Sequence, residues 1–271
     1  MAHKQEKSVQ DNERRFGGVA RLYGSTFLKK LQLRHVVVVG LGGVGSWVVE
    51  ALSRFGVQQL SLIDLDHVSI SNTNRQLQAL DGCFGESKVK ASSNRARLIN
   101  PSIQINEIED WIDEHNINSI LSAIAPPFDA ILDCTDQVNA KAALFFYAQT
   151  HRIPLVLSGA AGGKLSPQQL QIAPLVKTTH DPLLAKLRAC LRKKYAGTGL
   201  DIDQSPSSLV KAIFSTESVK YPQTEDAENA SCHTTTDRQG LNCGGFGSSL
   251  LVTGSMALLM VYTLLDEWQK E

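Results

Sequence analysis

The sequence predicts an α/β protein built on a doubly wound, mostly parallel β-sheet of the Rossmann-like kind. Over residues 31–160, short runs rich in Val, Ile and Leu alternate with segments whose apolar residues repeat at helical spacing. The first of these runs enters a glycine-rich turn that leads directly into a helix. With 271 residues, 42% of them hydrophobic, and a formal net charge of zero, the chain has the composition of a soluble globular protein.

Each expected element follows from its own residue pattern. The run at 36–40 begins with four valines, as a strand buried on both faces does, and the run at 103–109 alternates. Gly56 and the Asn-Pro-Ser at 100–102 end the first two helices. The predicted strands cover residues 36–40, 59–66, 103–109, 128–136 and 153–160, and the predicted helices cover residues 44–55, 87–99, 139–150 and 181–195.

We expect one domain over residues 1–271, with a nucleotide-binding half at about 31–160 and a C-terminal α/β extension. Residues 222–240 are rich in polar side chains, which predicts a mobile loop. The uncharged run at 246–265 is long enough to cross a bilayer, but Gly, Ser and Thr dilute it. A buried helix, in the core or at a dimer interface, is therefore favoured over membrane association through this run.

The cysteines and the N-terminus bear on location. The five cysteines are Cys83, Cys134, Cys190, Cys232 and Cys243, and no two of them form a CxxC pair. A zinc ribbon is therefore not expected, and Cys83 and Cys134 are interpreted as packing residues. The charged N-terminus lacks the apolar core of a signal peptide, so we expect a cytoplasmic, reducing environment.

The stretch VVVVGLGGVGSW, residues 36–47, carries the first candidate binding residues. Gly40, Gly42 and Gly45 form a GxGxxG pattern, with Gly43 inside it, between a strand and a helix. Such a turn lets phosphate approach the backbone at a helix N-terminus. Asp64, at the end of the next strand, is placed to accept hydrogen bonds from ribose hydroxyls. This pattern predicts a nucleotide site.

The residues after Asp64 separate the nucleotide-binding classes. Lys88 opens the helix after GES, and a polar segment contributes five more candidates: Ser71, Asn72, Asn74, Arg75 and Gln76. Two cations beside one nucleotide suit ATP, because negative charge grows on the leaving pyrophosphate during transfer. A dehydrogenase leaves Arg75 and Lys88 unexplained. The alternative for either cation alone is ordinary solvated charge.

Asp136 completes the predicted site. It lies at the carboxyl end of the run 128–136, on the sheet edge where open α/β folds bind ligands. A carboxylate there can hold Mg²⁺ on the phosphates of ATP, and Gln137 follows it. Asp133 lies outside this group, because its position predicts the opposite side of the strand and a structural role.

The motifs GLGGVGS, LIDLD, SNTNRQ, GESK and CTDQ, in this order, resemble those of the ubiquitin-activating-enzyme superfamily, which includes bacterial sulfur-carrier adenylyltransferases. RFGGVARLYG at 15–24 and the segments at 160–172, 176–188 and 214–217 narrow the resemblance to the tRNA threonylcarbamoyladenosine dehydratases, over roughly residues 14–265. This resemblance implies a ubiquitin-activating-enzyme-like fold and a homodimer. It also implies ATP-dependent, cyclising dehydration of threonylcarbamoyladenosine beside the anticodon of tRNA, through activation of its carboxylate.

The resemblance implies further partners as well. It implies ATP, Mg²⁺ and a monovalent cation as cofactors. It also implies tRNA and a cysteine-desulfurase system as partners. No stable DNA partner is expected. Sulfur-carrier activators usually carry two CxxC zinc pairs, which this chain lacks. They also carry an arginine near the start that reaches the partner subunit's ATP. Gly17 and Gly18 occupy that neighbourhood here, and Arg21 is the nearest replacement.

A basic segment and one cysteine remain open to two interpretations each. Residues 181–195 carry leucines on one side and five cations: Lys186, Arg188, Arg192, Lys193 and Lys194. They form either a solvated helix face or a surface that contacts tRNA phosphates. Cys232 is either a catalytic thiol, which forms a thioester or accepts sulfur, or a chance exposed thiol.

Three other functions compete with the leading one. The first is adenylation of the C-terminus of a ubiquitin-like sulfur carrier, which uses the same chemistry on a protein substrate. The second is a nicotinamide dehydrogenase, which would bind a nicotinamide cofactor. The third is a non-catalytic adaptor, which would bind ATP without releasing pyrophosphate.

Overall fold

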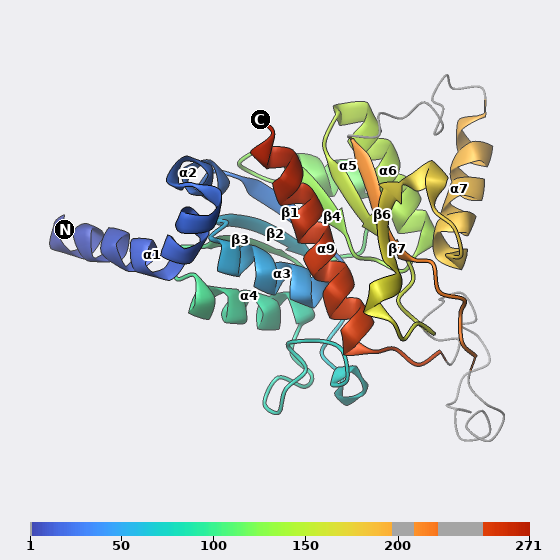
Figure 1. The fold of residues 1–271 in the computed structure, drawn as a ribbon, viewed down its shortest axis with the longest axis horizontal. Helices are drawn as coiled ribbons and strands as arrows, with labels where there is room; N and C mark the ends of the chain where they lie inside the picture. Colours follow the sequence, from blue (N-terminus) through green and yellow to red (C-terminus); the bar gives the residue numbers. More distant parts are fainter. Residues whose placement is uncertain (1, 197–208, 222–245) are drawn as a thin grey trace.

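The computed structural model describes residues 2–196, 209–221 and 246–271 (Figure 1). The loop expected at 222–240, together with Cys232 and Cys243, lies outside the described residues.

The centre of the molecule is a seven-stranded sheet in the order β3-β2-β1-β4-β5-β7-β6. Every neighbouring pair is parallel except β6 and β7, which are antiparallel. The predicted α/β class, with a mostly parallel sheet and a C-terminal extension, is confirmed. The strands are β1 (His35–Val39), β2 (Gln59–Ile63), β3 (Gln104–Ile108), β4 (Ala130–Asp133), β5 (Leu155–Ser158), β6 (Leu170–Pro174) and β7 (Val210–Ser215).

Helices cover both faces of this sheet, and alternate side chains of one strand meet different helices (Figure 1). Val36 and Val38 of β1 pack with α3, α4 and α9, whereas Val37 and Val39 pack with α5, α6 and α7. All five residues of β1 are buried, as the valine run predicts. The helices are α1 (Ala2–Tyr23), α2 (Ser25–Gln32), α3 (Gly45–Phe55), α4 (Lys88–Ile99), α5 (Ile117–Ser122), α6 (Val138–His151), α7 (Pro182–Tyr195) and α9 (Leu250–Gln269). Short 3-10 turns lie at Ile70–Asn72, Pro167–Gln169 and Leu175–Lys177.

The strand order reverses at β1, which pairs with β2 on one side and β4 on the other. The connections from these strands therefore leave the sheet in opposite directions and open a crevice at the carboxyl edge. The glycine turn follows β1, Asp64 follows β2, and the segment of Asp136 follows β4. The fold thus brings three candidate segments to one edge.

Several elements are not among those predicted from the sequence. The helices α1 and α2 precede β1, and Phe16 of α1 packs within 3.1 Å of the Cβ position of Gly56, at the C-terminal end of α3. The strands β6 and β7 extend the sheet beyond β5. β6 exposes much of its length, and Lys211 interrupts the apolar residues of β7, so neither carries the continuous apolar run of a central strand.

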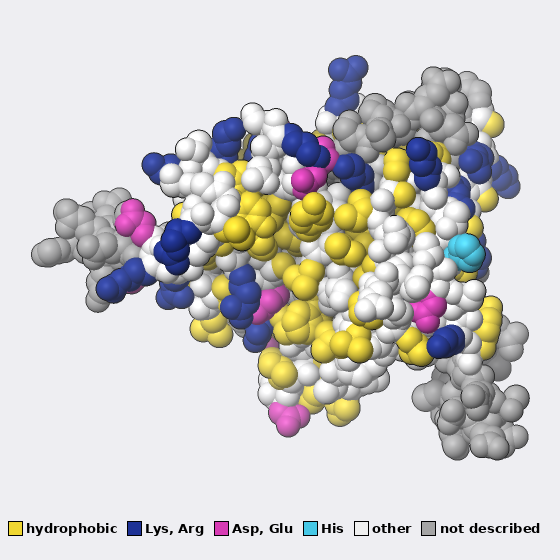
Figure 2. Space-filling model, in the orientation of Figure 1, with side chains coloured by type: hydrophobic (Ala, Val, Ile, Leu, Met, Phe, Trp, Pro, Cys, Tyr) yellow, Lys and Arg dark blue, Asp and Glu magenta, His cyan; other side chains and the backbone are white. Residues whose placement is uncertain are grey.

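The apolar C-terminal run forms helix α9. Among the described residues it is the one helix long and apolar enough to cross a membrane, yet 56% of its most apolar window is buried. Its inner side packs on the sheet and on α3, as a core helix does. Its outer side leaves Leu251, Leu258 and Tyr262 more than half exposed, and Figure 2 shows hydrophobic side chains gathered over this part of the surface.

Candidate functional site

The glycine turn is compact because two of its glycines leave no space for a side chain. Gly40 has φ 84°, and a Cβ there would lie 3.0 Å from the carbonyl of Cys134. A Cβ on Gly45 would lie 1.8 Å from the carbonyl oxygen of Gly40. Because Gly45 is the first residue of α3, this close approach folds the turn back onto the helix N-terminus.

Asp64 follows β2 directly and is held by backbone donors. Its Oδ2 accepts a hydrogen bond from the Leu41 amide at 2.5 Å, and its Oδ1 accepts one from the Asp66 amide at 2.8 Å. Burial raises the pKa of this carboxyl, and the nearby Lys88 ammonium acts in the opposite direction. The side chain lines the cleft, and its remaining lone pairs are available to ribose hydroxyls.

Lys88 is the first residue of α4 and is buried rather than solvated. Its Nζ lies 2.7 Å from Asp66 Oδ2 and 3.9 Å from Asp64 Oδ1, and only 7% of the side chain is exposed. The N-cap hydroxyl of Ser87 accepts from the Lys90 amide and fixes the start of the helix. Lys88 is therefore a fixed cation at the edge of the cleft.

Arg75 is the second cation of the cleft, and its neighbours hold it. Its Nη1 donates to the Ser71 carbonyl and to Asn74 Oδ1, each at 2.9 Å, while its own carbonyl accepts from Trp47 Nε1 at 3.0 Å. Asn74 Nδ2 in turn donates to the Ser248 carbonyl at 2.8 Å. Ser71 and Asn74 are predicted as nucleotide ligands, but the structure places both outside the cleft lining and beside Arg75.

Asp136 does not end a strand, contrary to the expected strand over 128–136. β4 stops at Asp133, because the amide and hydroxyl of Thr135 both donate to Asp133 Oδ1, at 2.9 and 2.7 Å, and turn the chain. Asp136 therefore lies in the loop before α6, where Gln137 Nε2 donates to its Oδ1 at 3.3 Å. Both residues line the cleft.

These segments enclose a cleft of about 610 Å³. Ten predicted residues line it: Gly40, Gly42, Gly43, Asp64, Asn72, Arg75, Gln76, Lys88, Asp136 and Gln137. Asn72 also caps the short turn that begins at Ile70, where its Oδ1 accepts from the Ser69 amide at 3.0 Å. Gln76 is buried, and its Oε1 accepts from Gln78 Nε2 at 3.4 Å.

Besides Ser71 and Asn74, two described residues of the predicted set do not line the cleft. Gly45 lies beneath the glycine turn, where it contacts Gly40 rather than a ligand. Arg21 is on α1, which packs at the C-terminal end of α3, and the glycine turn is at the other end of that helix. Cys232 lies outside the described residues.

Other cleft residues are missing from the predicted set. Trp111 follows β3, is 58% exposed and lines the cleft with Asp110. Residues 158–162 form one wall, and Thr253 of α9 reaches the cleft from more than 200 residues further along the chain than the glycine turn. An exposed aromatic after a predicted strand is a signal that sequence reasoning can use, whereas the approach of α9 is tertiary.

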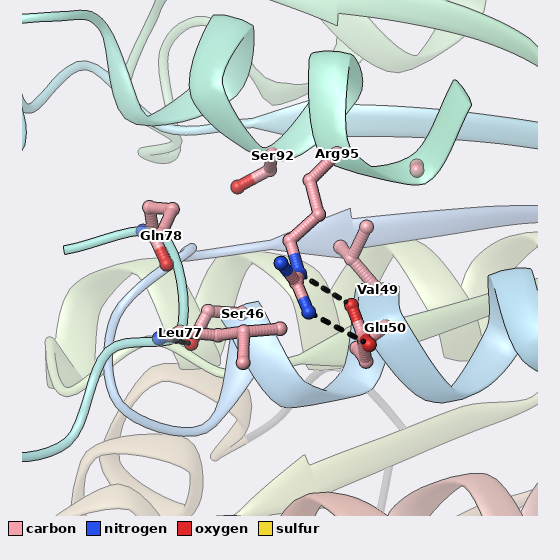
Figure 3. Close-up of a pocket in the computed structure, with 8 residues that line it drawn as sticks. Ser46, Val49, Glu50, Leu77, Gln78, Ser92 and Arg95 are labelled. Carbon is pink, nitrogen blue, oxygen red and sulfur yellow. Dashed lines mark hydrogen bonds and ion pairs between the residues drawn. The ribbon is translucent and has the colours of Figure 1, made fainter. Parts of the chain in front are cut away.

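A half-buried ion pair braces the helices beneath the site. Arg95 of α4 donates from Nε to Glu50 Oε2 at 2.7 Å and from Nη2 to Glu50 Oε1 at 3.1 Å (Figure 3). The pair lines a hollow of about 10 Å³ with Ser46 and Gln78. Gln78 Nε2 donates to the Leu41 carbonyl at 2.8 Å. This arrangement ties α4, which carries Lys88, to α3 and the glycine turn.

Replacing Glu50 with Gln is expected to destabilise the protein by about 1–3 kcal/mol at neutral pH, because Arg95 and Arg54 lose a charged acceptor. Burial raises the pKa of Glu50, but the hydrogen bonds from both arginines outweigh it, so the pKa is lowered from 4.5. A lowered folded-state pKa stabilises the protein above about pH 4.5, and this contribution is lost as pH falls through the folded value. Thermal melts of both proteins from pH 7 to pH 3 should therefore converge; a constant difference would contradict this origin.

The charges of the cleft suit a nucleotide that arrives with a cation. The lining has two cations, Arg75 and Lys88, and four carboxylates: Asp64, Asp66, Asp110 and Asp136. Burial also raises the pKa of the Cys134 thiol far above its usual range, which agrees with a packing role. Within the described ranges, no group of three or more His, Cys, Asp or Glu side chains could hold a metal.

Comparison with known proteins identifies the family. The model of the ThiF family matches residues 17–271. This chain belongs to the ThiF family. Members that resemble it over nearly their whole length include the tRNA threonylcarbamoyladenosine dehydratase of Haemophilus influenzae, 39% identical over 97% of this chain and 96% of that protein. The dehydratase of Escherichia coli is 38% identical over 91% of this chain and 90% of that protein.

Solved structures of the E. coli dehydratase resemble this chain as well. The E. coli tRNA N6-threonylcarbamoyladenosine dehydratase in complex with ATP has a TM-score of 0.81 and 36% identity, over 95% of both chains. The same enzyme in complex with AMP gives the same TM-score, identity and coverage. A molybdopterin-synthase adenylyltransferase of H. influenzae is 38% identical over only 49% of this chain and 53% of that protein. The resemblance to sulfur-carrier activation is thus confined to about half of the chain.

Proposed function

We propose that this protein is an ATP-dependent tRNA threonylcarbamoyladenosine dehydratase. One observation carries the proposal: relatives with this activity match this chain over nine tenths or more of both lengths. The cleft supports it, because it combines a phosphate-binding turn, a ribose acceptor and two cations at one edge of the sheet. The sulfur-carrier adenylyltransferases match only about half of the chain, which favours tRNA over a ubiquitin-like protein as the substrate.

The cleft residues suit adenylyl transfer to a carboxylate. The glycine turn offers backbone donors to phosphate, and Asp64 accepts from the ribose. Arg75 and Lys88 stand where negative charge grows as pyrophosphate leaves, which lowers the barrier more than it tightens binding. A urea atom of the same threonylcarbamoyl group then attacks the activated carbonyl carbon and loses its proton, and the bond to AMP breaks as the ring closes. Carboxylate oxygen thus leaves with AMP, which accounts for the net loss of water.

Mg²⁺ fits this cleft when the nucleotide supplies most of its ligands. Such ions are commonly bound through one or two carboxylates plus substrate phosphates, and Asp136 with the neighbouring Gln137 oxygen provides this kind of donor. The ion would neutralise phosphate charge during transfer. A monovalent cation and a cysteine-desulfurase partner stay predictions from the family resemblance.

The function is tested by incubating the protein with ATP, MgCl₂ and tRNA that carries threonylcarbamoyladenosine, followed by digestion and nucleoside mass analysis. We expect a product lighter than the substrate nucleoside by the mass of one water, and one pyrophosphate released per product. Pyrophosphate release that requires a ubiquitin-like sulfur carrier instead of tRNA would support the second function. ATP binding with no turnover on either substrate would indicate an adaptor.

The tRNA surface is proposed on α7. Leu183, Leu184, Leu187 and Leu191 are buried, which confirms that this helix is amphipathic and anchored. Lys186, Arg192 and Lys193 are exposed, and Figure 2 shows cations gathered at this end of the molecule. Arg188 donates to Thr178 Oγ1 and Lys194 pairs with Glu114, so these two cations also have structural roles. Leu183 lines the cleft, so the N-terminal end of α7 lies beside the cleft.

Reversing Lys186, Arg192 and Lys193 to Glu is expected to weaken tRNA binding and flatten its salt dependence, by about one unit of slope for each phosphate that the helix no longer neutralises. ATP affinity should be retained because none of the three lines the cleft. The measurement is a tRNA titration at several salt concentrations. Reversal of Lys29 and Lys30, exposed on α2 at the far side of the molecule, is the control. Equal slopes for the α7 variant and wild type would show that the cations of α7 are solvated and do not contact tRNA.

The exposed apolar side of α9 is proposed as a homodimer interface. Leu251, Leu258 and Tyr262 form it, and soluble monomers rarely leave such a patch on one helix uncovered. Arg21 is remote from the cleft of its own chain, and in a dimer it could reach the cleft of the partner subunit. We expect light scattering to give twice 29.6 kDa, and Leu258→Glu with Tyr262→Glu to give 29.6 kDa. A wild-type monomer, or a protein extracted only with detergent, would contradict the proposal.

A further inference from the structure

Four charged side chains that the proposed chemistry does not use lie buried behind the cleft. Asp133 and Lys141 are fully buried, and Lys141 Nζ lies 3.2 Å from Asp133 Oδ2. Asp181 is 4% exposed and Lys164 is 1% exposed. The four, which we call the buried charge network, come from β4, α6, the start of α7 and the loop before β6.

The first pair shapes the loop that carries Asp136. Asp133 Oδ1 accepts from both the amide and the hydroxyl of Thr135, while its Oδ2 faces Lys141 in the first turn of α6. The pair therefore joins the end of β4 to the start of α6 across the loop between them. That loop packs on the glycine turn, since a Cβ on Gly40 would touch Thr135 N at 3.0 Å.

Asp181 and Lys164 hold the opposite wall of the cleft through separate hydrogen bonds to the backbone. Asp181 Oδ2 accepts from the Ala160 amide and Oδ1 accepts from the Leu184 amide, each at 2.9 Å. A Cβ on Gly159 would lie 2.1 Å from Asp181 Oδ2, so this carboxylate presses against the wall backbone. Lys164 Nζ donates to the His180 carbonyl at 3.1 Å and to the Glu217 carbonyl.

The Asp133–Lys141 pair and the two charges at the wall, Asp181 and Lys164, act on each other electrostatically. Burial raises the pKa of the Asp181 carboxyl, and both Lys164 and Lys141 act on it in the opposite direction. A buried ion pair such as Asp133–Lys141 seldom stabilises a fold more than apolar residues of the same size would, but it fixes the geometry of its neighbours. Both loops that this network supports line the cleft.

We propose that the buried charge network is a positioning device, which holds the Asp136 loop and the wall at 159–162 at the spacing that the β- and γ-phosphates of ATP require. The inference rests on the proposed function and extends it. None of the four side chains touches substrate; they act through Thr135, Asp136 and the Ala160 amide. Misplacement of reacting groups by about 1 Å can lower a rate roughly 100-fold, so a shift of this loop should be measurable.

The test compares ATP with AMP, which lacks the β- and γ-phosphates. The variant is Asp133→Asn combined with Lys141→Met, which removes both charges at similar volume and keeps an acceptor for Thr135. We expect affinity for ATP with MgCl₂, measured by calorimetry, to fall about tenfold, and pyrophosphate release to fall by at least as much. Affinity for AMP should be unchanged. Lys164→Gln, at the far end of the network, should produce the same discrimination to a smaller extent.

The matched control is Lys211→Met with Glu267→Gln, an ion pair between β7 and α9 that does not line the cleft. It should leave the ratio of the two affinities unchanged. An equal loss of AMP and ATP affinity in the Asp133–Lys141 variant, with a lower Tm, would show that the network only stabilises the fold and would overturn the proposal, as would no change in either affinity. Because the two affinity measurements contain no tRNA, a wild type that binds both nucleotides but forms no cyclic product would refute only the proposed function.

Discussion

Replacing Lys88 with Ala is expected to lower ATP-dependent pyrophosphate release by about 100- to 1,000-fold, the scale of losing one oriented electrostatic donor. Lys88 is fixed by Asp66 at 2.7 Å and buried beside the cleft, so it needs little reorganisation when charge develops on the leaving phosphates. Nucleotide affinity should change far less, because most of this interaction forms in the transition state.

The neighbouring Lys90 provides the control for this prediction. It lies two residues further along α4 and is exposed, so Lys90→Ala should leave turnover unchanged. Both variants need rapid-quench or coupled assays of pyrophosphate release at saturating ATP, together with calorimetric affinities. Turnover in Lys88→Ala equal to that of Lys90→Ala would refute the assignment. A parallel loss of affinity and turnover would instead mean that Lys88 serves mainly to balance Asp64.

Replacing Gly45 with Ala is expected to abolish nucleotide binding and to destabilise the fold by about 3 kcal/mol or more. The new Cβ would lie 1.8 Å from the Gly40 carbonyl oxygen, which is backbone and cannot rotate away. The turn would have to open, and its amides would then no longer converge on a phosphate. Cys134 Cβ, 3.2 Å from the same point, blocks movement on another side.

Gly18→Ala is the matched control for the same chemical change. Gly18 lies within α1, and nothing is found within 4 Å of its Cβ position. Alanine is a better helix former than glycine by roughly 1 kcal/mol, so this variant should be as stable as wild type or slightly more stable. Thermal melts and ATP titrations of both variants test the pair. A Gly45→Ala protein that binds ATP normally would show that the turn is not the phosphate site.

The sequence by itself determined the central fold and the two cations and two of the carboxylates that line the cleft. Four valines before Gly40 specify a strand buried on both faces, and the repeat of apolar residues after Val44 specifies a helix. These patterns are local, so each can be recognised from a short stretch of residues. Because parallel strands share a carboxyl edge, the same patterns also bring Gly40, Asp64 and Asp136 to one side. The motif resemblance then leads to the ThiF family and to the dehydratases within it, which the comparisons confirm.

Only the tertiary structure decided how these residues are supported. The position of Asp133 predicts a structural role, but its partner Lys141 lies on another element, and charge pairing across elements leaves no periodic signal. Thr253 lies on α9, far along the chain from the glycine turn, so no local pattern places it at the cleft. Local patterns also do not show that Ser71 and Asn74 hold Arg75.

The apolar run at the C-terminus is the clearest case of a choice that composition leaves open. Its residues satisfy a core helix and a membrane helix equally well by length and hydropathy. Packing against the sheet and α3, which depends on residues far away in the chain, made it the core helix α9. Local patterns therefore specify which elements form, whereas burial by distant partners decides which faces of those elements are covered.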